Sequence, residues 1–356
     1  MKQNTGLNLV ADIGGTNARF ALVEDKSHEL IKASNLVCAD YPTITDAILD
    51  YLERTALGFP VTAAISVASS VTSDQIVMTN NSWNFSISET RQALNCASLK
   101  VLNDYTALAL ALPFIGEAQC IKIGGGSQCE DFSKAVIGPG TGLGVSAVVP
   151  VADFWMPLEG EGGHVTYGAV TPREAKIIHI LGRTRKHISA ELLVSGGGIS
   201  SIYAALTEID KGRFLTLKPS EITHLALAGQ DALAIETLSI FCEILGTVAG
   251  NLALTLGARG GVYLGGGILP KVTDFLVASN FRQRFEDHGR FTSYLQKIPT
   301  YLINTEYPAL LGAMVSLQKE YASVGVVSNA SSNENLSDHS KNYQAGKTKE
   351  GNRVEN

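Results

Sequence analysis

The sequence has few charged residues and no organised set of cysteines, and each shortage excludes a class of protein. Charged side chains make up 17% of the 356 residues, and 34 acidic against 28 basic residues give a net charge of −6. No block of Lys and Arg is interleaved with aromatic residues, so we expect no nucleic-acid partner. The five cysteines are scattered without a CxxC pair, which excludes a disulfide framework and favours a reducing compartment.

The sequence also lacks a secretory signal and a membrane span. The opening MKQNTG has neither the basic nor the long apolar segment of a signal, so we expect a cytoplasmic protein. The most apolar long stretch, 235–258, carries Glu236, Glu243 and Asn251 in its interior. This pattern is typical of a buried core helix, and we expect no membrane partner.

Hydrophobic residues are plentiful, at 45%, and there are 35 glycines. Single cores tend to split beyond about 250–300 residues, so a chain of this length predicts two lobes with a cleft between them. Strand-like and helix-like patterns alternate through the first hundred residues, which predicts an α/β fold. Residues 323–356 are rich in Ser, Asn, Lys and Glu, and we expect them to form a disordered polar tail.

Capping residues and apolar periodicity predict a series of helices. The predicted helices cover residues 45–56, 86–95, 104–112, 171–181, 199–210, 221–227, 231–256, 281–287 and 308–321. The pair Ser86 and Glu89 predicts a capping box, and Thr171 with Glu174 predicts another.

Two glycine-rich turns share one pattern. Residues 9–23 (LVADIGGTNARFALV) and 134–149 (KAVIGPGTGLGVSAVV) each place a turn containing a threonine, Thr16 or Thr141, between two apolar strands. Either turn alone fits a tight hairpin or a cradle for an anion. The repetition predicts two related α/β halves that face one another, and it favours the cradle.

Phosphate is the natural ligand of such paired turns, because backbone N–H groups and a threonine hydroxyl can point at one anion. Asp12 precedes the first turn. A carboxylate beside phosphate is tolerated chiefly when a divalent cation lies between them, which predicts Mg²⁺. The spacing of GPGTGLG, which leads into a strand, disfavours a dinucleotide-binding Rossmann unit.

Asn103 and Asp104 lie where a buried strand passes into a helix, a place where ligands commonly bind in α/β sheets. Asp104 fits two roles. It can cap the helix N-terminus, or it can accept a proton from a hydroxyl group at neutral pH, since a helix N-terminus favours the ionised carboxylate.

Glu161 and His164 in EGEGGH have the spacing of two metal ligands on a helix, but the glycines between them disfavour that helix. The favoured interpretation is a loop that presents hydrogen-bond acceptors to a polyhydroxylated ligand, and a solvated turn is the alternative. Glu191, which follows the predicted cap Ser189, fits equally well a first-turn acid that complements the helix dipole.

Seven motifs in one order resemble bacterial glucokinases of the hexokinase-like, actin-type ATPase superfamily. They are ADIGGTNARFAL, MTNNSWNFS, LNDYTALALAL, GPGTGLG, EGEGGH, SAELLVSGGG and GGVYLGGGILP. The resemblance covers about residues 8–320. It is to the zinc-free branch, because the sequence has neither the cysteine-rich zinc motif of the related repressor/kinase group nor an N-terminal DNA-binding segment.

The resemblance implies a two-lobed actin-like ATPase (ribonuclease H-like) fold with an interlobe cleft. It implies a small domain of residues 1–113 with 304–322 and a large domain of residues 114–303. It also implies a homodimer that acts in glycolysis by transferring phosphate from ATP to the 6-hydroxyl of glucose, with Mg²⁺. The alternatives are a kinase for another hexose, such as fructose or mannose, and a non-catalytic sugar-binding regulator of the same fold.

The resemblance also implies a role for each candidate residue. Asp104 would be the general base, and Asp12 would hold Mg²⁺, directly or through water. The residues implied to hold the other sugar hydroxyls are Asn103, Glu161, His164 and Glu191. The residues implied to bind ATP lie in three glycine-rich segments and are Asp12, Gly14, Gly15, Thr16, Asn17, Gly138, Gly140, Thr141, Gly142, Gly265, Gly266 and Gly267.

Overall fold

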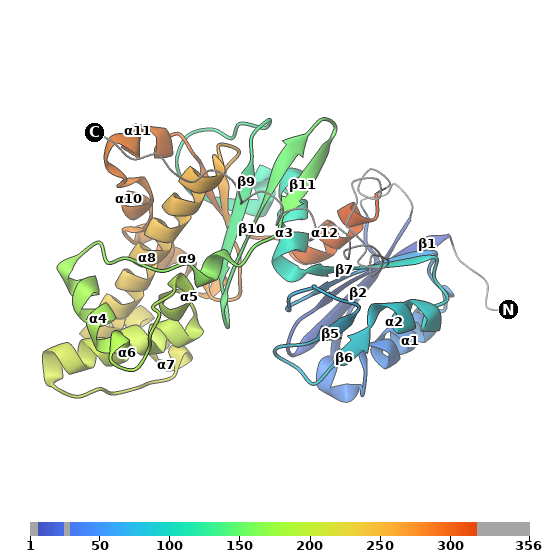
Figure 1. Ribbon diagram of the computed structural model, residues 1–356, viewed down its shortest axis with the longest axis horizontal. Helices are drawn as coiled ribbons and strands as arrows, with labels where there is room; N and C mark the ends of the chain where they lie inside the picture. Colours follow the sequence, from blue (N-terminus) through green and yellow to red (C-terminus); the bar gives the residue numbers. More distant parts are fainter. Residues whose placement is uncertain (1–5, 25–28, 319–356) are drawn as a thin grey trace, which may run out of the picture.

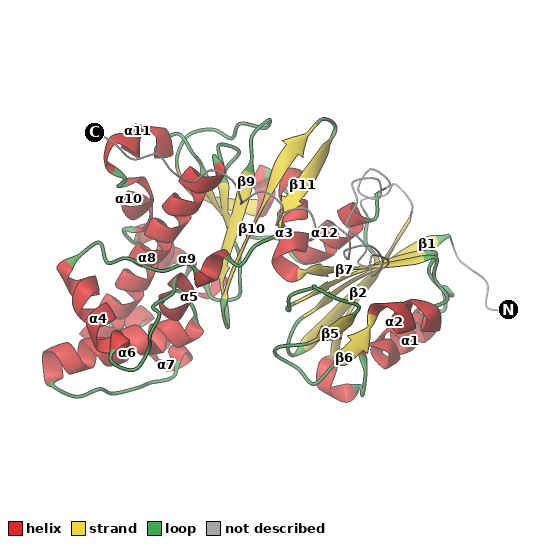
Figure 2. Cartoon of the chain, viewed as in Figure 1, coloured by secondary structure: helices red, strands yellow, loops and turns green. Residues whose placement is uncertain are grey.

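Two mixed β-sheets with helices packed against them form two lobes in the computed structural model, which describes residues 6–24 and 29–318 (Figures 1 and 2). The first sheet has the order β3 (Ile31–Val37), β2 (Asn17–Glu24), β1 (Leu7–Ile13), β4 (Thr62–Val67), β7 (Ser98–Asn103). The second has the order β11 (Phe154–Leu158), β10 (Leu143–Val151), β9 (Lys134–Pro139), β12 (Val262–Leu264), β13 (Thr300–Ile303), β8 (Cys120–Gly124). A small hairpin joins β5 (Gln75–Val77) to β6 (Asn84–Ser86).

The two sheets repeat one topology. In the first, the antiparallel strands β1, β2 and β3 are followed by β4, which pairs in parallel with β1. In the second, the antiparallel strands β9, β10 and β11 are followed by β12, which pairs in parallel with β9. The prediction of two related halves is therefore confirmed. The sequence patterns missed β3, β6, β8, β11 and β13, of which β8 has no counterpart in the first sheet.

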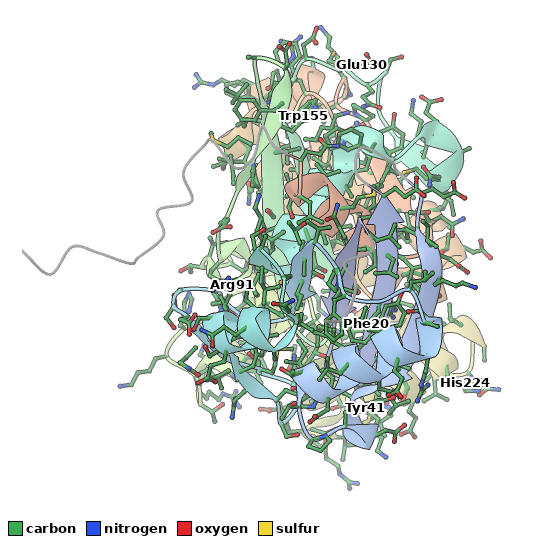
Figure 3. The ribbon with its side chains drawn as sticks, turned by 90° about the vertical axis from the view of Figure 1, so that its right-hand side faces the viewer. Phe20, Tyr41, Arg91, Glu130, Trp155 and His224 are labelled. Atoms are coloured by element: carbon green, nitrogen blue, oxygen red, sulfur yellow. The ribbon has the colours of Figure 1, made fainter. Side chains whose placement is uncertain are left out.

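Most helices lie on the outer faces of the sheets. On the first sheet these are α1 (Ile44–Thr55) and α2 (Ile87–Ala93). Phe20 of β2, which is labelled in Figure 3, stacks on Tyr51 of α1 with ring centroids 5.3 Å apart. The helical elements beside the second sheet are α4 (Pro172–Gly182), α5 (Ala190–Leu193), α6 (Gly196–Lys211), α7 (Pro219–Leu227), α8 (Ala232–Leu256), α9 (Thr273–Ala278), α10 (Phe281–Glu286) and α11 (Thr292–Leu295).

Several predicted caps are present, and two details differ from the prediction. The hydroxyls of Ser86, Thr171 and Ser189 accept hydrogen bonds from first-turn N–H groups. Neither predicted acid completes a capping box: among the described residues no hydrogen bond joins the Glu89 side chain to the Ser86 N–H, and Glu174 has other partners. Glu174 is buried, and it accepts hydrogen bonds from the Val170 N–H, the Tyr167 hydroxyl and Arg284.

The second difference is in α6, which begins at Gly196, before the predicted position, because Ser195 caps it by accepting a hydrogen bond from the Gly198 N–H. The end of the helix predicted at 308–321 and the tail predicted at 323–356 lie outside the described residues.

Helix α8 is the one described helix that is long and apolar enough to cross a membrane by length and composition. In its most apolar window, 72% of the residues are buried in the protein. It packs against α6, α7 and α10, so the prediction of a core helix is confirmed.

Two further helices, α3 (Asp104–Ala111) and α12 (Pro308–Ser316), lie between the sheets (Figure 1). Residues 106–111 of α3 are all buried, which explains why this helix is apolar on every side. α12 packs on α3 and on the inner face of the first sheet. The chain therefore returns to the first lobe after it has built the second.

Gly312 allows α12 to touch the backbone of α3. A Cβ at this position would lie 1.6 Å from the carbonyl oxygen of Ala107. Because no Cβ can approach an oxygen so closely, the separation of these helices depends on glycine.

We therefore predict that Gly312→Ala lowers the free energy of unfolding by about 1–3 kcal/mol or more, since overpacking forces the helices apart. Gly182→Ala is the matched control, because Gly182 also lies in a helix and a Cβ there would meet nothing within 4 Å. Thermal melts of both variants test this. Equal melting temperatures would contradict the packing argument.

Candidate active site

Asp104 lies at the first position of α3, directly after β7, and Asn103 caps this helix. The Asn103 Oδ1 accepts hydrogen bonds from the N–H groups of Tyr105 at 2.9 Å and Thr106 at 3.3 Å. The alternative in which Asp104 is the N-cap is therefore wrong. Asp104 Oδ1 accepts one bond, from the Tyr105 N–H at 3.0 Å, and no hydrogen bond among the described residues uses its Oδ2.

The environment of Asp104 raises its pKa from 3.8 to about 6. Burial is the largest cause, and the negative charge of Asp12 adds to it. Hydrogen bonds at the start of the helix lower the pKa, as expected from the sequence, but they are the weaker effect. The carboxylate is thus mostly ionised at neutral pH and is a stronger base than an exposed aspartate.

Asp12 lies at the end of β1 and has a partner on each oxygen. The Arg19 guanidinium is 2.9 Å from Oδ2, and the buried Ser66 hydroxyl donates to Oδ1 at 2.8 Å. Asp12 and Asp104 both line a cavity of about 560 Å³, together with Gly265 and Gly266.

The same cavity is lined by residues that the sequence reasoning missed, among them Arg19 and the segment 305–309. Tyr307 in this segment has a φ of +56° and precedes a proline, a combination that costs backbone energy. The Arg19 guanidinium lies 6.0 Å from the centre of its ring. The register of the β1–β2 hairpin pairs Arg19 with Asp12, so this contact is local. The segment 305–309 reaches Asp12 only through tertiary structure, because it follows β13, which the sequence patterns did not reveal.

Both predicted turns close antiparallel hairpins and still leave N–H groups for a ligand. Among the described residues, no hydrogen bond uses the backbone N–H of Gly15 or Thr16 in the first turn, or that of Thr141 or Gly142 in the second. Both threonines are exposed. The hairpin and cradle interpretations are therefore compatible, since one turn can serve both.

The N-terminus of α6 adds to the second turn. The Gly196 N–H donates to the Gly140 carbonyl at 2.9 Å, which places the positive end of the α6 dipole beside this turn. The motif SAELLVSGGG contains this helix start, but the sequence assigned it no role.

The four residues implied to hold a sugar lie near one another, and the His164 N–H donates a hydrogen bond to the Glu161 carbonyl at 3.0 Å. The Glu161 Oε1 accepts a hydrogen bond from the Ser70 hydroxyl at 3.0 Å, and the Asn103 side chain donates to the Ser69 carbonyl at 3.4 Å. His164 Nδ1 is 4.0 Å from Glu191 Oε1. Ser69 and Ser70 follow β4 of the first lobe, so both lobes contribute to this cluster.

Glu191 also connects the sugar cluster to the second turn. Its Oε2 accepts a hydrogen bond from the Leu143 N–H at 2.9 Å. EGEGGH forms a loop with one short 3-10 turn at Gly162–His164, in agreement with the prediction that it is not a metal-binding helix. Among the described residues, no group of three or more His, Cys, Asp and Glu side chains could hold a metal ion.

A family model described as glucokinase matches residues 9–320. The glucokinase of Aromatoleum aromaticum is 47% identical over 88% of this chain and 95% of that protein. The bifunctional protein glk of Burkholderia pseudomallei is 48% identical over 88% of this chain, which spans about half of that longer relative, 49%. A crystal structure of glucokinase from an Antarctic psychrotroph matches with a TM-score of 0.81 and 36% identity, over 88% of this chain and 98% of that one.

The duplicated sheets and the structural match define a two-lobed actin-like ATPase fold, as expected from the sequence. Within this fold, the length of the matched region and the sequence identity also identify the family. The chain belongs to the glucokinase family.

The raised pKa of Asp104 predicts a cost to stability. Its folded pKa of about 6 lies above the value of 3.8 for an exposed carboxyl, so stability falls as pH rises from about 4 through 6. Asp104→Asn removes this cost. We expect the variant to be more stable by about 1–3 kcal/mol at pH 8, with the advantage shrinking toward pH 4.

Urea unfolding in EDTA at several pH values measures this difference. Asp153→Asn is the control, because it removes an exposed carboxyl from a turn of the second lobe. An Asp104→Asn variant no more stable than the parent at pH 8 would show that the site does not disfavour the charge.

Proposed function

We propose that the protein is an ATP-dependent glucokinase, which transfers the terminal phosphate of ATP to the 6-hydroxyl of glucose and releases glucose 6-phosphate and ADP. The observation that carries this proposal is the position of Asp104. It is a half-buried carboxylate with a raised pKa, it shares a cavity with Asp12 and the 265–266 glycines, and it lies at the junction of the two lobes. Membership of the glucokinase family supports the same activity.

In this proposal Asp104 accepts the proton of the sugar 6-hydroxyl as the oxygen attacks phosphorus. Its Oδ1 is held by the Tyr105 N–H, which leaves Oδ2 for the substrate. Asn103, Glu161, His164 and Glu191 hold the remaining hydroxyls and align the attacking oxygen. Alignment of this kind accounts for much of the rate enhancement in phosphoryl transfer.

The two turns hold the phosphates of ATP from opposite lobes. The N–H groups of Gly15 and Thr16 and those of Thr141 and Gly142 are directed at the phosphate oxygens, and the α6 N-terminus adds positive potential. Gly265, Gly266 and Gly267 lie against the adenosine. Closure of the lobes then excludes water, which would otherwise compete with the sugar for the phosphate.

The residues at Asp12 fit a magnesium ion that is shared with the phosphates. Mg²⁺ keeps several waters and commonly uses one or two carboxylates beside phosphate oxygens. Because both oxygens of Asp12 already accept hydrogen bonds, Asp12 would hold the ion most simply through its water shell. The ion would supply charge neutralisation at the phosphates.

Further proposals concern the domain boundaries, the branch of the family, the assembly, and the compartment and pathway of the enzyme. The small domain comprises residues 1–113 and 304–322, and the large domain comprises 114–303. The enzyme is a zinc-free member of its group, it acts as a homodimer, and it works in the cytoplasm in glycolysis. The five cysteines, which are all free thiols, are consistent with a reducing compartment.

Asp104→Asn is expected to lower kcat by about 10²–10⁴, because it removes general-base catalysis while keeping the shape of the side chain. A coupled assay of ADP release with glucose, fructose and mannose measures both the loss and the sugar preference. Calorimetry should show that the variant still binds glucose. Turnover near that of the parent would refute the role of Asp104, and a preference for another hexose would refute glucose as the substrate.

Ser70→Ala is expected to raise KM for glucose by about two- to tenfold with little change in kcat. The variant loses the hydrogen bond that orients Glu161, worth about 0.5–1.5 kcal/mol. Ser73→Ala is the matched control from the same loop, since the Ser73 hydroxyl donates only to the nearby Gln75 carbonyl. Equal KM values in both variants would mean that Ser70 does not orient the sugar site.

A further inference from the structure

Tyr105 follows Asp104 in α3 and reaches into the hairpin of the second lobe. Its hydroxyl donates a hydrogen bond to the Gly138 carbonyl of β9 at 2.6 Å. Burial raises the pKa of this hydroxyl far above its usual range, so it remains a donor throughout the neutral range. The side chain therefore makes a fixed polar contact between α3 and β9.

Two glycines make room for the Tyr105 ring. Gly138 and Gly144 face each other across the β9–β10 hairpin. A Cβ on Gly138 would lie 2.3 Å from the Tyr105 hydroxyl oxygen, and a Cβ on Gly144 would lie 1.9 Å from Cε2 of the ring. Tyr105 therefore leaves no room for a side chain at Gly144. At Gly138 the tyrosine and the backbone of residues 265–266 together leave none.

The same hairpin carries the second phosphate turn. Gly138 is separated from Gly140 by one residue, and Gly144 directly follows Leu143, whose N–H binds Glu191. At its other end, Tyr105 is bonded to Asp104 through the peptide whose N–H also donates to the Asp104 carboxylate. A single side chain therefore links the turn to the carboxylate.

We propose that Tyr105 is a positioning residue, which fixes Asp104 relative to the second phosphate turn so that the base and the triphosphate remain aligned when the lobes close. This inference rests on the proposed function. Misplacement of a reacting group by about 1 Å can cost about 10²-fold in rate. The hydrogen bond from the Tyr105 hydroxyl to the Gly138 carbonyl resists such a shift, because a shift would lengthen or break it.

Tyr105→Phe tests the proposal, since it keeps the ring in its slot and removes only the donor. We expect kcat to fall about tenfold, with KM for glucose within about twofold, because the sugar ligands are untouched. Tyr203→Phe is the matched control. It removes a tyrosine hydroxyl that donates to Asp231 at 2.9 Å in the helical part of the second lobe. A kcat for Tyr105→Phe within twofold of the parent would overturn the proposal.

A binding measurement separates this inference from the proposed activity. In the parent, the ATP analogue AMPPNP should slow amide hydrogen exchange both in the hairpin, residues 138–145, and in the first turn of α3, residues 104–107. In Tyr105→Phe the protection of the hairpin should persist and that of α3 should be lost. Identical protection in the two proteins, or none in the parent, would overturn the proposal. A parent that lacks sugar-dependent ADP release would instead refute the glucokinase activity.

A comparison of two backgrounds distinguishes positioning from packing. Gly144→Ala in the parent is expected to lower the melting temperature, because its methyl group would overlap the Tyr105 ring. In a Tyr105→Val background the same substitution meets no ring and should lower the melting temperature much less, while kcat stays low in every variant that lacks the tyrosine. A parental kcat in Tyr105→Val would show that the ring only fills space.

Discussion

The position of helix α3 between the two sheets is the constraint on which the rest of the site depends. Its first residue is Asp104, and its buried length packs on the second sheet and on α12. The close approach of Gly312 to Ala107 fixes α12 against it. Because the rest of the helix is enclosed, Asp104 at its start is half-buried, and its unusual basicity follows from this partial burial and from the charge of Asp12.

Helix α3 also explains how residues of the two lobes meet at one cavity, because it follows a strand of the first sheet and packs on the second. In the proposed site, the first lobe supplies Asp12, Ser66 and the first turn, and the second supplies the second turn, Glu161 and Glu191. Neither lobe alone contains all of these residues. The segments that join them, β7–α3 and β13–α12, cross between the sheets, so the geometry of the site depends on how the lobes are packed rather than on either lobe alone.

Local sequence signals predicted the parts of this protein whose causes are local. The two glycine-rich turns, the caps at Ser86 and Ser189 and the long apolar helix α8 follow from neighbours along the chain, and the structure has them. The sequence predicted only part of what sets the pKa of Asp104. The helix dipole comes from neighbouring residues, whereas burial and the charge of Asp12 come from residues that are distant in the sequence. Glu174 pairs with Arg284, which is far away in sequence, so no local pattern could show that it is buried.

The hydrogen bond between Ser70 and Glu161 joins the two lobes. Ser70 occupies Oε1 of Glu161, and no hydrogen bond among the described residues uses Oε2. In the proposed function, a sugar hydroxyl would bind at Oε2 while Ser70 holds the carboxylate in place. The direction in which Oε2 is held then favours a hydroxyl group of one stereochemistry over its epimer.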